Sequence, residues 1–241
     1  MNLFGFRRPA LTAVKAWCSP FGADGLPGEL LALVDRLLAL LPEAPLEGSL
    51  NDSEPQSLST LRRALARLAP AELESLRLLD AGGELALLVG RDTASTPAAA
   101  GAPVLLFVVM LPPAGAASSD RVLALLAGEN LHHGYIRSLG ARLDPVTEAR
   151  PRPGAAPEAA AADRAGWLVP EADVRAGAVR GLYPANLLSG VALARLAGSG
   201  LKLPASIPAG GGVPWKPSPA EQKELVRRNP DFRAFLHFGA D

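Results

Sequence analysis

The run Pro103-Val-Leu-Leu-Phe-Val-Val-Met-Leu111 decides how this chain folds. It is much shorter than the roughly 20 apolar residues that a transmembrane helix needs. A short and continuous apolar run of this kind is typical of a strand that is buried on both faces. We therefore expect this run to form a central strand of a sheet.

The segments around this run have the patterns of further strands. Leu76–Leu79 and Glu84–Val89 are separated by the turn sequence Asp80-Ala-Gly-Gly83, which predicts a β-hairpin. His132–Leu143 is expected to return as another strand. Because the strands from Leu76 to Leu111 follow one another without intervening helices, the sequence favours an antiparallel meander over a doubly wound parallel sheet.

Leucines at helical spacing predict the main helices. Leu26–Pro42 has apolar residues three and four positions apart and a proline near each end. A second helix is expected from Leu58 to Leu68, after a polar loop at Glu47–Gln56. Ser118 or Ser119 can cap a third helix that runs to Ala127. Shorter helices are expected at Pro9–Trp17, near Val191–Ala197, and from Pro219, where Ser218-Pro-Ala-Glu221 is a capping box.

The C-terminal third is less regular. Ala149–Ala165 is of low complexity, and we expect it to be a mobile excursion, although it could also be a domain linker. Short strands are expected at Trp167–Val169 and, at a sheet edge, at Val213–Lys216, because Pro214 has no N–H to donate. The fold class that results is α+β, with an antiparallel sheet, helices packed on one face and an irregular C-terminal portion, in one domain over residues 1–241.

Composition excludes some classes of partner. The 24 basic and 24 acidic residues give a formal charge of zero, which argues against general nucleic-acid binding.

The single cysteine, Cys18, forms no internal disulfide and implies no oxidising compartment. Lys15 interrupts the apolar segment after Arg7-Arg8, and Trp17 is bulky where lipoprotein processing needs a small residue. We therefore expect a cytoplasmic protein with no targeting peptide and no membrane partner.

One group of residues suggests metal chemistry. On a continuing helix, Glu129, His132 and His133 would share a face and could hold a divalent metal for a metal-assisted hydrolase. The spacing matches none of the established zinc-hydrolase motifs. A helix C-terminus at which histidine stabilises the negative end explains the same residues more simply. We expect no metal and no cofactor, and the hydrolase stays a lesser alternative.

No other catalytic pattern is present in the sequence. Cys18 has no histidine near it in the chain, and a small buried residue is its simpler interpretation. The serines lack the Gly-x-Ser-x-Gly nucleophile elbow, and the glycine groups lack the lysine of a phosphate-binding loop. We therefore expect a protein without catalytic activity.

Two segments stand out as specific. They are Gly134-Tyr-Ile-Arg-Ser-Leu139 and Val179-Arg-Gly-Leu-Tyr-Pro-Ala-Asn-Leu-Leu-Ser-Gly190, and they hold the only two tyrosines, each near an arginine. The second contains a turn sequence at Tyr183–Asn186, so a rigid corner is one interpretation. A recognition surface is the other, because tyrosine, arginine and tryptophan supply much of the binding energy at interfaces. The expected partner-binding residues are Tyr135, Arg137, Trp167, Arg180, Tyr183 and Trp215.

The chain from Leu76 to Leu188 resembles bacterial immunity proteins of polymorphic-toxin and type VI secretion systems. The resemblance rests on a helix-flanked antiparallel sheet followed by the patterns Gly-Tyr-x-Arg-x-Leu and Tyr-Pro-x-Asn-Leu-Leu. It implies a cytoplasmic protein that neutralises a cognate toxin by binding it. An adaptor or effector-loading chaperone of a secretion system fits the same features and remains an alternative.

Overall fold

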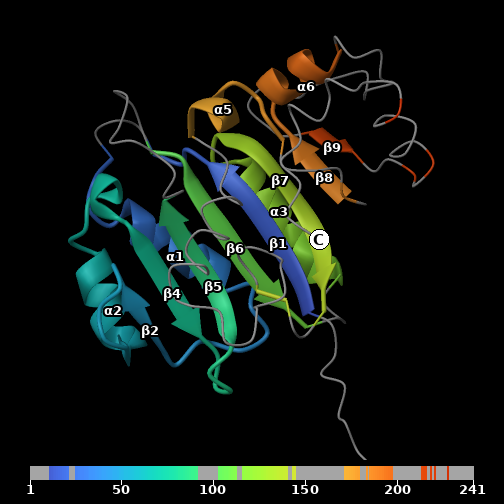
Figure 1. The fold of residues 1–241 in the computed structure, drawn as a ribbon. Coiled ribbons are helices and arrows are strands. Elements are labelled where there is room, and N and C mark those ends of the chain that lie inside the picture. The colour runs from blue at the N-terminus through green and yellow to red at the C-terminus, as the bar shows by residue number, and fades with distance from the viewer. Residues whose placement is uncertain are drawn as a thin grey trace, which may run out of the picture.

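The fold is an α+β arrangement built on one antiparallel sheet (Figure 1). The computed structural model describes residues 11–21, 25–91, 103–112, 116–140, 143–144, 171–179, 183, 185–197, 213–215, 218, 220 and 227. Within these residues the strands are β1 (Leu11–Cys18), β2 (Glu47–Leu50), β3 (Gln56–Ser57), β4 (Ser75–Leu79), β5 (Leu85–Arg91), β6 (Leu105–Leu111), β7 (Leu131–Leu139), β8 (Ala185–Leu188) and β9 (Val213–Trp215). The helices are α1 (Glu29–Leu38), α2 (Leu58–Leu65), α3 (Ala116–Ala127), α5 (Glu171–Arg175) and α6 (Gly190–Ala197), with a 3-10 turn at Pro70–Glu72.

The apolar run forms β6, which lies in the middle of the sheet. The strand order is β3-β2-β4-β5-β6-β1-β7-β8-β9, and neighbouring strands are antiparallel. Every residue of β6 is buried, which confirms a strand covered on both faces. The β4–β5 hairpin and the meander from β4 to β6 are also confirmed.

The prediction of a helix at Pro9–Trp17 is wrong. Residues from Leu11 onward form β1, which pairs with β6 on one side and β7 on the other. The last six residues of this strand, Ala13 to Cys18, are all buried. A strand buried on both faces has no alternation of apolar and polar residues, and its alanines and lysine favour a helix locally. Pairing with two distant strands overrides that local preference.

The prediction of a loop at Glu47–Gln56 is right only for its middle: β2 occupies Glu47–Leu50 and β3 begins at Gln56, whereas residues 51–55 between them form neither helix nor strand. Gly48 lies opposite Leu78 on β4. A Cβ atom at position 48 would lie 2.1 Å from the carbonyl oxygen of Arg77, so only glycine allows β2 to approach β4 this closely. The sequence feature that marks β2 is therefore a single glycine, Gly48, and not an apolar pattern.

One face of the sheet packs against α1, α2 and α3, as predicted. The apolar cluster on this face joins alternate residues of the central strands, such as Ala16, Phe107 and Val109, to leucines of α1 and α2 and to Val122 and Leu126 of α3. The β7 strand can pack closely against β1 and α3 because residue 134 is glycine. A Cβ atom at this position would lie 3.0 Å from the Lys15 carbonyl oxygen and 3.1 Å from a side-chain carbon of Leu123. Among the described residues, no helix is long and apolar enough to cross a membrane.

The opposite face carries a second cluster. It contains Trp17, Leu106, Val108 and Tyr135, with Val174 of the short helix α5 packed against it. Alternate side chains of β1 and β6 therefore enter two separate cores, as strand geometry requires. The sheet thus has helices α1 to α3 on one face and a mixed aromatic and aliphatic layer on the other.

Several predictions concern the C-terminal third. The helix near Val191–Ala197 and the edge strand at Val213–Lys216 are confirmed as α6 and β9. The strand at Trp167–Val169 and the segment 149–165 lie outside the described residues, as does nearly all of the helix expected from Pro219.

We expect Phe107→Ala to lower the free energy of unfolding by about 3–5 kcal/mol, because it opens a cavity in the middle of the sheet. The Phe107 side chain is fully buried. Leu46→Ala is the matched control, since Leu46 is 62% exposed, and its effect should stay within about 0.5 kcal/mol. Urea denaturation measures both. Equal effects of the two substitutions would contradict the assignment of β6 as the central strand.

Candidate functional site

The candidate site lies on the face of the sheet opposite α1 to α3. There the register aligns Val108, Lys15, Tyr135 and Asn186 in one row across β6, β1, β7 and β8. A neighbouring row places Trp17 beside His133. Polar and aromatic side chains from three strands therefore meet on one face, within a sheet whose other face is apolar.

Aromatic rings connect these rows. The rings of Tyr135 and Tyr183 are stacked, with centroids 3.8 Å apart and an angle of 11° between their planes. The ring of His133 is stacked on Trp17 at 5.7 Å and lies 5.6 Å from Tyr135. The contact between Tyr135 and Tyr183 unites the two segments that the sequence singled out.

Tyr183 is held in place by its own turn. Its backbone N–H donates a hydrogen bond of 3.0 Å to Oδ1 of Asn186, and the Asn186 amide nitrogen donates to the Tyr183 carbonyl oxygen. Asn186 is itself buried in β8. Asn186 therefore bonds the neighbouring backbone, as predicted for this segment, and its two bonds hold the Tyr183 backbone beside the start of β8. Pro184, which was expected to shape the turn, lies outside the described residues.

Arg137 lies at a half-buried edge of this cluster. Its guanidinium carbon lies 5.5 Å from the centroid of the Tyr183 ring, which is cation–π geometry. Arg137 and Tyr183 are half-buried, whereas Tyr135 beneath them is fully buried. We call the stack of Arg137, Tyr183 and Tyr135 the Arg–Tyr platform.

The structure brings together three of the six predicted partner-binding residues. Tyr135 is fully buried, so it supports Tyr183 and presents no surface of its own. Trp167 and Arg180 lie outside the described residues. Trp215 belongs to β9, where its backbone lies opposite Asn186.

Sequence reasoning missed Lys15 as a member of the cluster. Lys15 is fully buried between Val108 and Tyr135, with Nζ 6.0 Å from the centroid of the Tyr135 ring. Lysine is almost never fully buried unless its ammonium group is paired. Its place in the core depends on the pairing of β1 with β6 and β7, which the expectation of a helix at this position concealed.

The structure separates the three candidate metal ligands. The expected continuing helix ends at Ala127, and His132 and His133 are consecutive residues of β7, so their side chains point to opposite faces. The Glu129 carboxylate accepts a hydrogen bond of 2.8 Å from Arg36 of α1. In the part of the chain that the structure describes, no group of three or more His, Cys, Asp or Glu residues is arranged to hold a metal ion.

His132 and Cys18 have structural partners. The Oγ atom of Ser19 lies 2.8 Å from Nε2 of His132, and Ser19 is only 3% exposed. Burial lowers the pKa of His132, and the nearby Arg175 lowers it further, against a smaller opposing effect of Glu171.

Burial raises the pKa of the Cys18 thiol, whose Sγ donates to the Leu126 carbonyl oxygen. A nucleophilic cysteine needs the opposite shift.

Comparison with protein-family models, with curated proteins and with solved structures finds no match to this chain. The geometry of the described residues is therefore the guide to function. The Arg–Tyr platform combines a rigid aromatic stack with a half-buried guanidinium, and such groups recognise a partner surface through stacking and hydrogen bonds.

We expect His132 to make the stability of the protein depend on pH. Because the folded state lowers its pKa below the ordinary value of 6.5, the unfolded chain takes up a proton first as the pH falls. The free energy of unfolding should therefore begin to decline below pH 6.5 and stop declining once folded His132 is protonated. The free energy of unfolding of the unsubstituted protein is compared with that of the variant His132→Gln, by urea denaturation between about pH 8 and about pH 5.

The variant loses the bond to Ser19, so it should be less stable than the unsubstituted protein by about 1 kcal/mol at pH 8. That difference should narrow as the pH falls, because only the unsubstituted protein has the titrating His132. The other two histidines are present in both proteins and cancel. A difference that stays constant with pH would contradict the inferred pKa direction.

Proposed function

We propose that this chain is a non-catalytic cytoplasmic binding protein that acts as an immunity protein and neutralises a bacterial toxin by direct contact. The observation that carries this proposal is the Arg–Tyr platform. Arginine and tyrosine are among the residues that most often dominate the energy of protein interfaces. Here Arg137 and Tyr183 are half-buried, and the Tyr183 ring is stacked on the buried Tyr135 of β7.

The rigidity of the platform supports a binding role. The Tyr183 backbone is fixed by Asn186, and its ring is stacked on buried Tyr135. A side chain that is ordered before binding loses less conformational entropy when the partner arrives. This favours a surface whose shape is set in advance for one partner.

An adaptor or effector-loading chaperone is the alternative, because it would use the same platform without inhibiting what it binds. The test begins with affinity capture from the native host and identification of stoichiometric partners by mass spectrometry. The captured protein is then assayed for toxicity with and without this chain. Inhibition supports the immunity role, and binding without inhibition supports the adaptor.

We expect Arg137→Ala and Tyr183→Ala each to weaken binding to the captured partner by about tenfold or more, as hot-spot residues do. Isothermal titration calorimetry measures the affinities, and thermal unfolding checks that each variant is folded. Arg137→Lys keeps the charge but loses the planar guanidinium, so it should recover only part of the affinity.

Arg63→Ala is the matched control, since Arg63 is an exposed arginine of α2. It should leave the affinity unchanged. If Arg137→Ala and Tyr183→Ala also bind with unchanged affinity, the platform is not the interface.

A further inference from the structure

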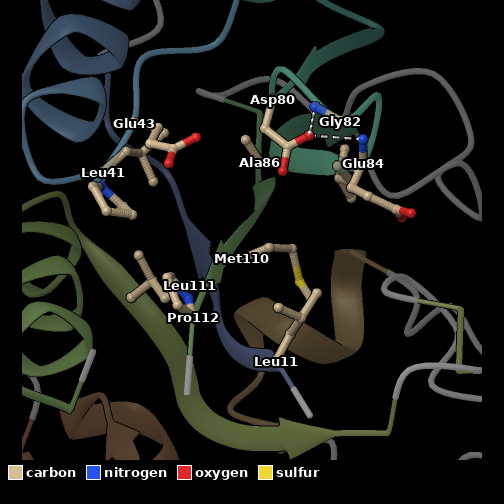
Figure 2. Close-up of a pocket in the computed structure, with 12 residues that line it drawn as sticks. Leu11, Leu41, Glu43, Asp80, Gly82, Glu84, Ala86, Met110, Leu111 and Pro112 are labelled. Atoms are coloured by element: carbon tan, nitrogen blue, oxygen red, sulfur yellow. Dashed lines mark hydrogen bonds between the residues drawn. The ribbon is translucent and has the colours of Figure 1, made fainter. Parts of the chain in front are cut away.

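A pocket opens at the end of the sheet where the β4–β5 turn, the start of β1 and the end of β6 meet. Its volume is about 490 Å³. Figure 2 shows side chains from these elements and from the segment after α1 around one opening. The volume falls within the range of about 300–1,000 Å³ that is usual for binding pockets.

The floor of the pocket is apolar. It includes Leu11 of β1, Leu85 of β5, and Met110 and Leu111 of β6. Met110 and Leu111 are buried, whereas Leu11 and Leu85 are partly exposed. The floor therefore offers apolar surface that another side chain can cover, and the removal of such surface from water is favourable.

The rim of the pocket is acidic. Glu43 follows α1 on one side, and Asp80 and Glu84 belong to the β4–β5 turn on the other (Figure 2). Among the described residues that line the pocket, there is no lysine, arginine or histidine. The pocket therefore presents negative charge beside an apolar surface, although the whole chain has a formal charge of zero.

The roles of these carboxylates differ. Asp80 holds the turn, because its Oδ1 accepts backbone hydrogen bonds from Gly82 at 2.8 Å and from Glu84 at 2.9 Å. Glu43 and Glu84 are exposed. Asp80 therefore shapes the rim, and the charges of Glu43 and Glu84 can be removed without breaking that turn.

We propose that this pocket binds a segment of the protein partner in which an apolar side chain is flanked by lysine or arginine. An apolar centre inside a polar rim is the general anatomy of a protein interface. The acidic rim selects against acidic segments and favours basic ones, because complementary charge determines which partner is accepted. In Figure 2 the carboxylates of Glu43, Asp80 and Glu84 lie along the upper edge of the opening, and Met110, Leu111 and Leu11 lie along its lower part.

The pocket adjoins the Arg–Tyr platform. Met110 on its floor lies in the same cross-strand row as Ala13 and Arg137. Strands are spaced about 4.8 Å apart, so two strand spacings separate Met110 from Arg137. One partner surface can therefore reach both features, and the inference rests on the proposed protein-binding function because it names the chemistry of that partner.

The test uses the full chain and a fluorescent pentapeptide with phenylalanine between two pairs of lysines, measured by fluorescence anisotropy. We expect saturable binding that weakens about tenfold for E43Q/E84Q, which removes two exposed charges from the rim. The control E54Q/E74Q removes two exposed glutamates outside the pocket lining and should bind the peptide as the unsubstituted chain does. Raising the salt from about 0.05 M to about 0.5 M should also weaken binding, without any substitution.

Two further peptides separate the apolar contribution from the charge. Replacement of the central phenylalanine by alanine should weaken binding, and replacement of the lysines by glutamates should abolish it. Absence of saturable binding, or equal weakening by both double variants, would overturn the pocket inference, as would equal binding of the phenylalanine and alanine peptides. Those results concern the pocket alone, whereas capture of a partner and the Arg137 and Tyr183 variants test the proposed function.

Discussion

The pairing of β1 with β6 is the constraint on which the rest of the structure depends. The two strands come from separate parts of the chain and pair from Thr12–Leu111 to Cys18–Leu105. Both are buried on two faces. A sheet of this kind is stable only when each face is covered, since exposed apolar surface would remain in contact with water. The helices on one face and the aromatic layer on the other meet that requirement.

The two faces of the sheet are covered in different ways, and this difference determines on which face the candidate site lies. The face beneath α1, α2 and α3 is filled by aliphatic side chains and Phe107, which fix the sheet without offering recognition chemistry. The opposite face includes Lys15, His133 and Asn186 among aromatic rings. Buried polar groups must be satisfied, so they restrict the arrangement of this layer more than apolar packing alone does. The platform of Arg137, Tyr183 and Tyr135 belongs to that restricted layer, and its Arg137 lies two strand spacings from Met110 of the acidic-rimmed pocket.

Strong local patterns made much of this fold predictable. The apolar run at β6, the turn between β4 and β5, and the leucine spacing of α1 each identified an element. The strands β1 and β2 were not predictable, for two different reasons. In β1 the residues favour a helix locally, and two distant partners override them. In β2 the decisive feature is the close approach at Gly48, which no apolar pattern reveals.

Local patterns in the chain were sufficient to predict an α+β fold around the run that becomes β6 and to single out the two tyrosines with their neighbouring arginines. These conclusions depend on local composition and spacing, which are visible in one segment at a time. Only the tertiary structure decided that Tyr135 lies beneath Tyr183, that Lys15 is buried beside them, and that His132 and His133 face apart. The first two facts depend on which distant strands pair and in which register, and the third depends on His132 and His133 being in a strand and not in a helix. Register is fixed by the packing of whole faces, and no single segment contains that information.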